Sequence, residues 1–145
     1  RQAVRAHLYP EPLCALGRFL AQRRLASSAM DVSDGLSTDL GRLCEASDVG
    51  ARIWADHIPG ARPRAARELP LSMALHGGED YALLFTVPRG KAHRLPSSLE
   101  GIHLYKIGEV CASRQRLLVF QDGKEQPLIA AGYDHFRGKA VTRDQ

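Results

Sequence analysis

The sequence has few cysteines and no long hydrophobic run. The three cysteines, Cys14, Cys44 and Cys111, form no CxxC pair and no Cys/His cluster with zinc spacing. Because Cys14 and Cys44 fall where helices are expected to bury them, we interpret them as small core residues and expect a reducing, cytoplasmic compartment. No apolar stretch approaches the roughly 18 residues that cross a bilayer, so we expect no membrane partner.

Several familiar functional patterns are also missing. The chain contains no P-loop, no GxGxxG turn, no Ser/His/Asp order and no zinc finger. Its formal charge of +4 would suit a nucleic-acid partner, but the arginines are spread along the chain and no RNP-like aromatic motif accompanies them. We therefore interpret the basic residues as solvated faces and expect no nucleic-acid partner.

What is present is an ordinary globular composition, with 44% apolar and 25% charged residues. The length of 145 residues predicts one domain, 1–145, with a core of its own. The chain begins RQAVRAHLYPEP, without a methionine, a hydrophobic leader region or a small-residue cleavage site. We therefore expect no secretory signal in this stretch, and we expect the chain to be a fragment of a longer protein.

Apolar spacing and turn residues predict interspersed helices and strands. Helices are expected from Pro10-Glu11-Pro12 through Leu20, from Leu36 to about Gly50, within 61–68 and within 70–75. Strands are expected at 29–32, 51–56, 81–87, 102–107, 117–120 and just after Pro127. The stretch 81–87 is continuously apolar, which suits a strand covered on both faces, and Asp122-Gly123 marks a hairpin turn. The pattern predicts an α/β (α+β) sandwich in which helices pack on a mixed β-sheet.

The first segment that could carry chemistry is Asp31-Val32-Ser33-Asp34-Gly35, at an expected strand-to-helix turn. Side chains alternate along a strand, so Asp31 and Ser33 point the same way, and Asp34 follows at the turn. Two carboxylates and a hydroxyl suit Mg²⁺, which takes one or two carboxylates together with phosphates and water, and a helix N-terminus favours a phosphate. The alternative is that Ser33 or Asp34 only caps the helix that follows.

The second segment is His76-Gly77-Gly78-Glu79-Asp80-Tyr81. Paired glycines let a backbone pass close to a ligand or adopt a positive φ. Because an unpaired buried charge is costly, we expect Glu79 and Asp80 at the mouth of the following strand, where a ligand can reach them. The alternative is a plain helix C-cap followed by a solvated turn. No acid–base arrangement identifies His76 as catalytic.

The third segment is Gly132-Tyr133-Asp134-His135-Phe136, near the end of the sequence. Two aromatic rings, an acid and a histidine could build a lid that stacks on a base or another ring. Equally, Tyr133 and Phe136 could pin the chain end to the core. Periodicity does not choose between these interpretations.

Taken together, these segments resemble the C-terminal domain of the thiamine-monophosphate kinase family. The family pattern is an Asp-x-Ser-Asp-Gly-Leu turn, then Ala-Leu-x-Gly-Gly-Glu-Asp-Tyr-Glu-Leu-Leu-Phe-Thr, an Ile-Gly strand end and Gly-aromatic-Asp-His-Phe. In this sequence it is found in the same order, at Asp31–Leu36, Ala74–Thr86, Ile107-Gly108 and Gly132–Phe136. The likeness extends from about Tyr9 to Phe136, nearly the whole chain.

The resemblance implies that the complete protein transfers the γ-phosphate of ATP to thiamine monophosphate and yields thiamine diphosphate. It implies Asp31 and Asp34 as Mg²⁺ ligands and Ser33 as an ATP contact. Glu79 and Tyr133 are implied to contact the thiamine phosphate, Tyr133 through its ring. The implied fold is that of aminoimidazole-ribonucleotide-synthetase-like proteins, whose C-terminal domain is an α/β sandwich. No nucleophile is implied, which agrees with phosphoryl transfer as a reaction of positioning and charge neutralisation.

Two departures from the family pattern matter. Ala82 stands where the family usually has Glu. The family's N-terminal domain, with most of its acidic metal cluster, much of its phosphate pocket and its dimer interface, has no counterpart in these 145 residues. We therefore expect the chain to supply half of a site in an enzyme that is a homodimer when complete, and to be inactive alone. The alternatives are the C-terminal domain of another ATP-dependent synthetase of the superfamily, or a non-catalytic binding module.

Overall fold

The structure, a computed structural model, describes residues 9–59 and 70–132 of the chain. The helix expected within 61–68 and the residues from Tyr133 onward lie outside this part, so the interpretations that concern them stay predictions. Among the described residues, no helix is long and apolar enough to span a membrane.

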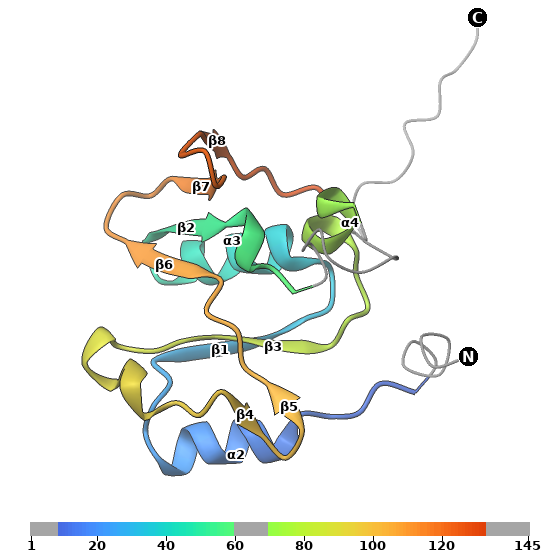
Figure 1. Cartoon of the computed structure of the whole chain (residues 1–145), viewed down its shortest axis with the longest axis vertical. Coiled ribbons are helices and arrows are strands. Elements are labelled where there is room, and N and C mark those ends of the chain that lie inside the picture. Colours follow the sequence, from blue (N-terminus) through green and yellow to red (C-terminus); the bar gives the residue numbers. More distant parts are fainter. Residues whose placement is uncertain (1–8, 60–69, 133–145) are drawn as a thin grey trace, which may run out of the picture.

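Figure 1 shows two layers of structure with a strand pair between them. The helices are α2 (Cys14–Gln22), α3 (Leu36–Ala46) and α4 (Leu71–His76), with short 3₁₀ helices η1 (Ala55–His57) and η2 (Arg89–Arg94). The strands are β1 (Ser28–Val32), β2 (Gly50–Trp54), β3 (Ala82–Thr86), β4 (Ser98–Leu99), β5 (Ile102–His103), β6 (Gly108–Cys111), β7 (Arg116–Val119) and β8 (Glu125–Pro127). Helices and strands are interspersed along the chain, and the predicted α/β class is confirmed.

The strands form three sheets. The largest has the order β6-β2-β7-β8 and is mixed, because β2 is antiparallel to β6 and parallel to β7, while β8 is antiparallel to β7. β1 pairs antiparallel with β3, from Ser28 opposite Thr86 to Val32 opposite Ala82, and β4 and β5 form a short hairpin. The predicted mixed sheet is therefore the four-stranded one, and the strand that leads to the first motif belongs to a separate pair.

Each layer in Figure 1 has its own cluster of apolar side chains. We call α3, α4 and the four-stranded sheet the upper layer, and α2, η2 and the β4–β5 hairpin the lower layer. The upper cluster joins α3 and α4 to the four-stranded sheet; its buried members are Val32, Leu36, Leu40, Cys44, Ala51, Ile53, Ala55, Ile58, Leu75, Leu118 and Leu128. The lower cluster is built on α2; its buried members are Leu16, Leu20 and Leu25. Full burial of a leucine-sized side chain contributes roughly 1.5–3 kcal/mol, so the upper cluster contributes more to stability than the lower one.

The strand pair β1–β3 lies between the two layers (Figure 1). Leu84 packs against the upper cluster, whereas Leu83 and Phe85 pack against the lower cluster. Successive side chains of β3 thus face opposite layers, as the pleat of a strand requires. The prediction of a strand covered on both faces is confirmed, although these side chains are half-buried rather than fully buried.

The cysteines do not share one environment. Cys44 is buried in the upper cluster, as predicted, but Cys14 is exposed at the start of α2. The buried stripe of that helix runs through Leu16 and Leu20, and a residue two positions before Leu16 falls on the opposite face of the helix. The prediction that a helix buries Cys14 is therefore wrong.

Two strand predictions also need correction. The strand expected at 102–107 is limited to Ile102–His103, because a turn at Gly101, with φ +83°, folds it back onto β4. The chain then crosses from the lower to the upper layer, where β6 begins (Figure 1). β8 ends at Pro127 instead of starting after it; it is an edge strand, where the missing N–H of proline is tolerated. The hairpin turn at Asp122-Gly123, between β7 and β8, is confirmed.

Candidate functional site

The turn between β1 and α3 holds the first predicted segment. β1 ends at Val32 and α3 begins at Leu36, so Asp31 lies at the carboxyl end of the strand and Ser33 and Asp34 lie in the turn. Asp31 is exposed, and the other two residues are half-buried. The predicted location of these residues, between a strand end and a helix start, is confirmed.

The alternative that Ser33 or Asp34 caps α3 is wrong. The N-cap is Gly35, with φ +112°, and no side chain makes a cap hydrogen bond. Instead, Asp39 in the first turn of the helix reaches back, and its Oδ2 accepts hydrogen bonds from the amides of Ser33 and Asp34, each at 3.0 Å. Charge-assisted bonds of this kind are about twice as strong as neutral ones, so a carboxylate from within the helix holds the turn.

Sequence analysis missed Asp39, which is 0% exposed. The signal that could have found it is an acid on the buried face of an amphipathic helix, immediately before Leu40 and three residues after Leu36. A carboxylate in such a place requires polar partners, because an unpaired buried charge is costly. Those partners had to come from the neighbouring turn.

Arg42 joins the turn to the helix. Its Nη1 donates to Asp39 Oδ1 at 2.8 Å and to Asp34 Oδ2 at 2.5 Å. The Asp39 side chain is 0% exposed, the Asp34 side chain 14% and the Arg42 side chain 51%. The hydrogen bond to Asp34 is the main cause that raises the pKa of Arg42, so the guanidinium keeps its charge. One cation, Arg42, pairs with two carboxylates. Asp31, three residues before Asp34, adds a third negative charge, so the net charge of the turn is negative.

The second predicted segment folds against the first. The Glu79 amide donates to the Ser33 carbonyl oxygen at 2.8 Å, and the Tyr81 amide donates to the Val32 carbonyl oxygen at 2.9 Å. A Cβ on Gly78 would lie 2.7 Å from the Ser33 oxygen, which only glycine avoids. This glycine therefore serves the contact between the two segments.

A helix cap accounts for only part of this loop. Gly77 is the C-cap of α4 and its amide donates to the Met73 oxygen at 2.8 Å, but its φ is an ordinary −65°. The left-handed values fall on Glu79, with φ +68°, and Tyr81, with φ +48°, at a cost of about 1–2 kcal/mol for each residue with a Cβ. A plain helix C-cap therefore does not account for the backbone of Glu79 and Tyr81.

Glu79 and Asp80 are exposed at the mouth of β3, as predicted for acids within reach of a ligand. Although Asp80 is exposed overall, neighbouring protein atoms partly desolvate its carboxyl group and raise its pKa above the ordinary value. A carboxyl group whose charge the protein disfavours, at the mouth of a strand, is typical of a binding site.

Two hydroxyl groups on α3 connect all three segments. The oxygen Oγ of Ser37, a residue 1% exposed, lies 2.8 Å from His76 Nδ1. The same oxygen accepts a hydrogen bond from the Ala131 amide at 3.4 Å. Thr38 Oγ1 accepts one from the Gly132 amide at 3.1 Å, across 94 positions of the chain. His76 thus has a hydrogen-bonding partner in the scaffold.

Gly132, the first residue of the third segment, lies against the same turn. A Cβ there would stand 2.0 Å from the Asp34 carbonyl oxygen and 2.6 Å from Thr38 Oγ1. Such distances exclude any side chain at this position. Tyr133 lies outside the described residues, so its role stays a prediction.

The described residues hold no group of three or more His, Cys, Asp or Glu side chains that could bind a metal ion. Asp31 and Asp34 therefore do not form a complete cation site by themselves, and Asp34 is already paired with Arg42. One or two carboxylates are what Mg²⁺ takes from a protein when phosphates and water supply the remaining positions. The donor set fits a shared Mg²⁺ site and does not fit a closed structural metal site.

Comparison with known proteins assigns the chain to a family. Residues 2–119 match the family described as AIR synthase related protein, C-terminal domain, and the chain belongs to that family. Among curated proteins, the chain is 41% identical over 138 residues to thiamine-monophosphate kinase of Escherichia coli strain K12, and 38% identical over 138 residues to that of Salmonella typhimurium. Each match covers 92% of this chain but 42% of the relative, so the chain spans less than half the length of these relatives.

Solved structures are similar over most of this chain. AaThiL complexed with AMPPCP and TMP has a TM-score of 0.70 and 28% identity, over 92% of this chain and 40% of that one. Thiamine-monophosphate kinase from Stenotrophomonas maltophilia K279a has a TM-score of 0.67 and 35% identity, over 84% of this chain and 39% of that one. The HypE–HypF complex, with a TM-score of 0.65 and 17% identity over 79% of this chain and 39% of that one, shows the fold alone.

Proposed function

We propose that the chain is the C-terminal part of a thiamine-monophosphate kinase, which transfers the γ-phosphate of ATP to thiamine monophosphate and yields thiamine diphosphate. The observation that carries this proposal is the meeting of three segments at one turn: Ser33-Asp34-Gly35 contacts both the Glu79 loop and Gly132. The 41% identity to the Escherichia coli kinase supports it. So does the likeness to AaThiL, whose structure holds AMPPCP, an analogue of ATP, together with TMP.

The turn leaves a defined set of groups for a phosphate. The amides of Ser33 and Asp34 already donate hydrogen bonds to the Asp39 carboxylate, so they are not the donors that a nucleotide would use. The Ser33 hydroxyl is the proposed ATP contact, and Arg42, with a side chain 51% exposed, is a cation that pairs with the neighbouring Asp34. Phosphoryl transfer depends on placing such groups before the reaction begins.

Asp31 and Asp34 are the proposed ligands of Mg²⁺. The ion would supply charge neutralisation along the polyphosphate, the main requirement of phosphoryl transfer. What these residues contribute is a fixed pair of oxygen donors: Arg42 orients the Asp34 carboxylate at 2.5 Å, and the pairing of β1 with β3 fixes the backbone of Asp31 opposite Leu83.

Glu79 and Tyr133 are the proposed contacts of the thiamine phosphate. The left-handed backbone of Glu79 places this exposed acid directly beside Ser33, so acceptor and nucleotide would meet at one turn. The thiazolium ring of thiamine is cationic, and a carboxylate near an aromatic ring is suited to a cation of that kind. The rest of the proposed enzyme is an N-terminal ATP-binding domain, in a cytoplasmic homodimer.

The test is a kinase assay on the longer protein, in which this chain is joined to the region encoded upstream of Arg1. We expect Mg²⁺-dependent formation of thiamine diphosphate and ADP from thiamine monophosphate and ATP. Chromatographic separation of the thiamine phosphates measures the product. A purified, folded protein that forms no thiamine diphosphate would contradict the proposed function.

A variant pair tests the metal ligand separately. Asp31→Asn should lower turnover by roughly a hundredfold or more, because it removes a charged ligand at a polyphosphate. Asp48→Asn is the matched control: this exposed acid follows α3 at its far end and pairs with Arg114 at 2.7 Å. An Asp31→Asn enzyme with an unchanged rate at saturating Mg²⁺ would remove Asp31 from the metal site.

The 145-residue chain alone is expected to fold, to show no kinase activity and to bind Mg-ATP only weakly. Its two clusters give it a core, but two carboxylates are too few donors to offset the entropy of binding a nucleotide. Calorimetric titration of Mg-ATP into the chain measures this. Micromolar binding, or turnover well above background, would show that the chain is self-sufficient.

A further inference from the structure

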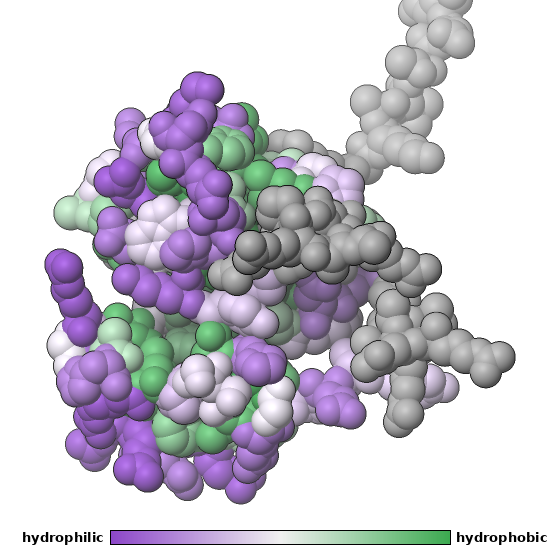
Figure 2. Space-filling view, viewed as in Figure 1, coloured by the Kyte–Doolittle hydropathy of each residue, from purple (hydrophilic) through white to green (hydrophobic). Residues whose placement is uncertain are grey.

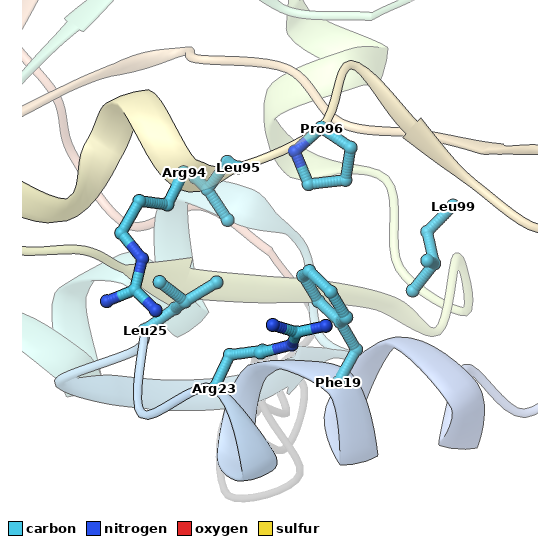
Figure 3. A pocket seen from close by; sticks show the side chains of 7 residues that line it. All are labelled: Phe19, Arg23, Leu25, Arg94, Leu95, Pro96 and Leu99. Carbon is cyan, nitrogen blue, oxygen red and sulfur yellow. The ribbon is translucent and has the colours of Figure 1, made fainter.

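A pocket in the lower layer lies away from the turn described above. It is a cavity of about 420 Å³, between the last turn of α2 and the segment that leads from η2 to β4 (Figure 3). Phe19 and Leu25 line it from one side, and Leu95, Pro96 and Leu99 line it from the other. This volume is in the range of small-molecule sites, which are mostly apolar with a few polar groups.

Two guanidinium groups stand at this apolar pocket. Arg23 and Arg94 both line it, and Figure 3 shows Arg94 reaching from η2 toward Leu25 and Arg23 extending from α2 beside Phe19. Neither arginine belongs to an ion pair with any residue that the structure describes. Two like charges on one pocket repel each other, and a bound anion would relieve that repulsion.

The walls of the pocket are positively charged as a whole. The stretches 13–27 and 82–99 contain no Asp or Glu, and six cationic residues: Arg18, Arg23, Arg24, Arg89, Lys91 and Arg94. Lys91 Nζ donates to the Arg24 carbonyl oxygen at 2.7 Å, which ties η2 to the end of α2 and fixes the two walls relative to each other. Figure 2 shows apolar surface in this lower part of the molecule, rimmed by hydrophilic side chains.

We propose that this pocket binds a small amphipathic anion, a molecule with an apolar ring system and one phosphate, sulfonate or carboxylate group. The ring fits the walls formed by Phe19, Leu25 and Leu99. The anionic group is met by Arg23 and Arg94, whose planar guanidinium groups match such oxygens with paired hydrogen bonds. Charge alone would attract any anion, whereas the apolar walls select one that carries a ring.

The pocket is separate from the candidate active site. Leu25 precedes β1 and the Ser33 turn follows it, and β1 has five residues, so the two places are roughly 16 Å apart along the strand. The proposal therefore does not depend on the kinase function, and an inactive kinase would leave it standing.

The experiment is a fluorescence titration of this chain with 1-anilinonaphthalene-8-sulfonate, an aromatic sulfonate. We expect saturable binding at one site. Arg23→Gln combined with Arg94→Gln should weaken the binding at least about tenfold, because charge-assisted hydrogen bonds are lost. Arg18→Gln is the control, since it removes one positive charge from α2 at a residue that does not line the pocket; its affinity should stay close to that of the unchanged chain. An unchanged thermal unfolding midpoint shows that the variants are folded.

Displacement of the dye by three competitors separates the ring from the charge. 1-Naphthyl phosphate should displace it at far lower concentrations than either 1-naphthol, which has no charge, or inorganic phosphate, which has no ring. Phosphate as effective as naphthyl phosphate would mean attraction by surface charge alone, and naphthol as effective would mean an unspecific apolar surface. Either result, or an equal affinity of the Arg18 and the Arg23/Arg94 variants, would overturn the proposal.

Discussion

The upper and lower layers are held together in different ways. Around the β1–α3 turn, backbone lies against backbone, with Gly78 at the Ser33 oxygen and Gly132 at the Asp34 oxygen. In the lower layer, Gly17 in α2 and Gly90 in η2 have nothing within 4 Å of the place where a Cβ would stand. Gly17 and Gly90 are therefore replaceable, whereas Gly78 and Gly132 are not.

Charge follows the same division. The turn in the upper layer contains a buried carboxylate, Asp39, that is fully engaged by two amides and by Arg42. The lower layer instead displays arginines around a pocket. Reacting groups must be held within about half an ångström of their productive positions, and an interlocked backbone with a buried charge provides that rigidity. The comparison teaches that the upper layer is the part of the chain built for precision.

The largest expected effect on stability comes from Asp39→Ala. This change leaves the amides of Ser33 and Asp34 without their acceptor and removes one partner of Arg42. A buried donor that loses its acceptor costs about 1–3 kcal/mol, and this variant affects two amides at once; urea unfolding of the chain would measure the loss. Asp39→Asn keeps an acceptor oxygen and should cost less. An alanine variant as stable as the unchanged chain would break the comparison between the layers.

The next effect is expected from the pair Gly132→Ala and Gly90→Ala. A methyl group at 132 would stand 2.0 Å from a backbone oxygen, whereas at 90 it meets open space. Overpacking of this kind costs about 1–3 kcal/mol, so the first variant should melt at a lower temperature and the second should melt close to the unchanged chain. Equal melting temperatures would mean that the turn can yield and that the contrast is overstated.

A smaller effect, of opposite sign, is expected from Gly17→Ala. Gly17 lies inside α2 with open space around it, and alanine is favoured over glycine in a helix by up to about 1 kcal/mol. The chain should therefore become more stable to urea. A loss of stability would show that the added methyl group meets neighbouring atoms, and that Gly17 does not lie in open space.

The smallest effect is expected from Asp80→Asn and is visible only against pH. Because desolvation raises the pKa of Asp80, the folded chain binds this proton more tightly than the unfolded chain, and stability falls as pH rises from the ordinary carboxyl pKa through the raised value. The variant should lack this fall. Its gain at neutral pH should be roughly a few tenths of a kcal/mol, since solvent screens an exposed group.

Thermal unfolding of both proteins between about pH 3 and pH 7 makes the measurement. Asp48→Asn serves as the control, because its exposed carboxylate is paired with Arg114. Parallel stability curves for the unchanged chain and the Asp80 variant would contradict the desolvation of this carboxyl group.

The elements could be predicted from the sequence better than the contacts between them. Helical spacing of Leu36, Leu40 and Leu43 locates α3, and the buried stripe agrees with it. The role of Asp39 could not be predicted in this way, because its partners are amides in a turn whose shape depends on how β1 enters the helix. Local patterns report what a residue prefers, and a buried polar residue is explained only by its neighbours in space.

For the candidate site, too, the sequence predicted which segments take part but not how they contact each other. The resemblance to a family predicts that three segments belong together, and the structure brings Ser33, Gly78 and Gly132 to one turn. The approach of Gly132 to Asp34 could not be read from spacing, because it joins distant parts of the chain. The pocket between Arg23 and Arg94 was equally unpredictable, since the basic residues looked like solvated faces until the fold placed them around a cavity.

The hydrogen bond from the Gly132 amide to Thr38 spans 94 residues, and this distance has a consequence for how the protein is made. A ribosome adds roughly 5–20 residues per second, so β1 and α3 emerge about five to twenty seconds before the glycine that covers their turn. A contact between residues so far apart in sequence also slows folding, because a long loop must close first. The turn that gathers the three segments is therefore completed late, and a nascent chain cut short before Gly132 would carry both apolar clusters but an unfinished site.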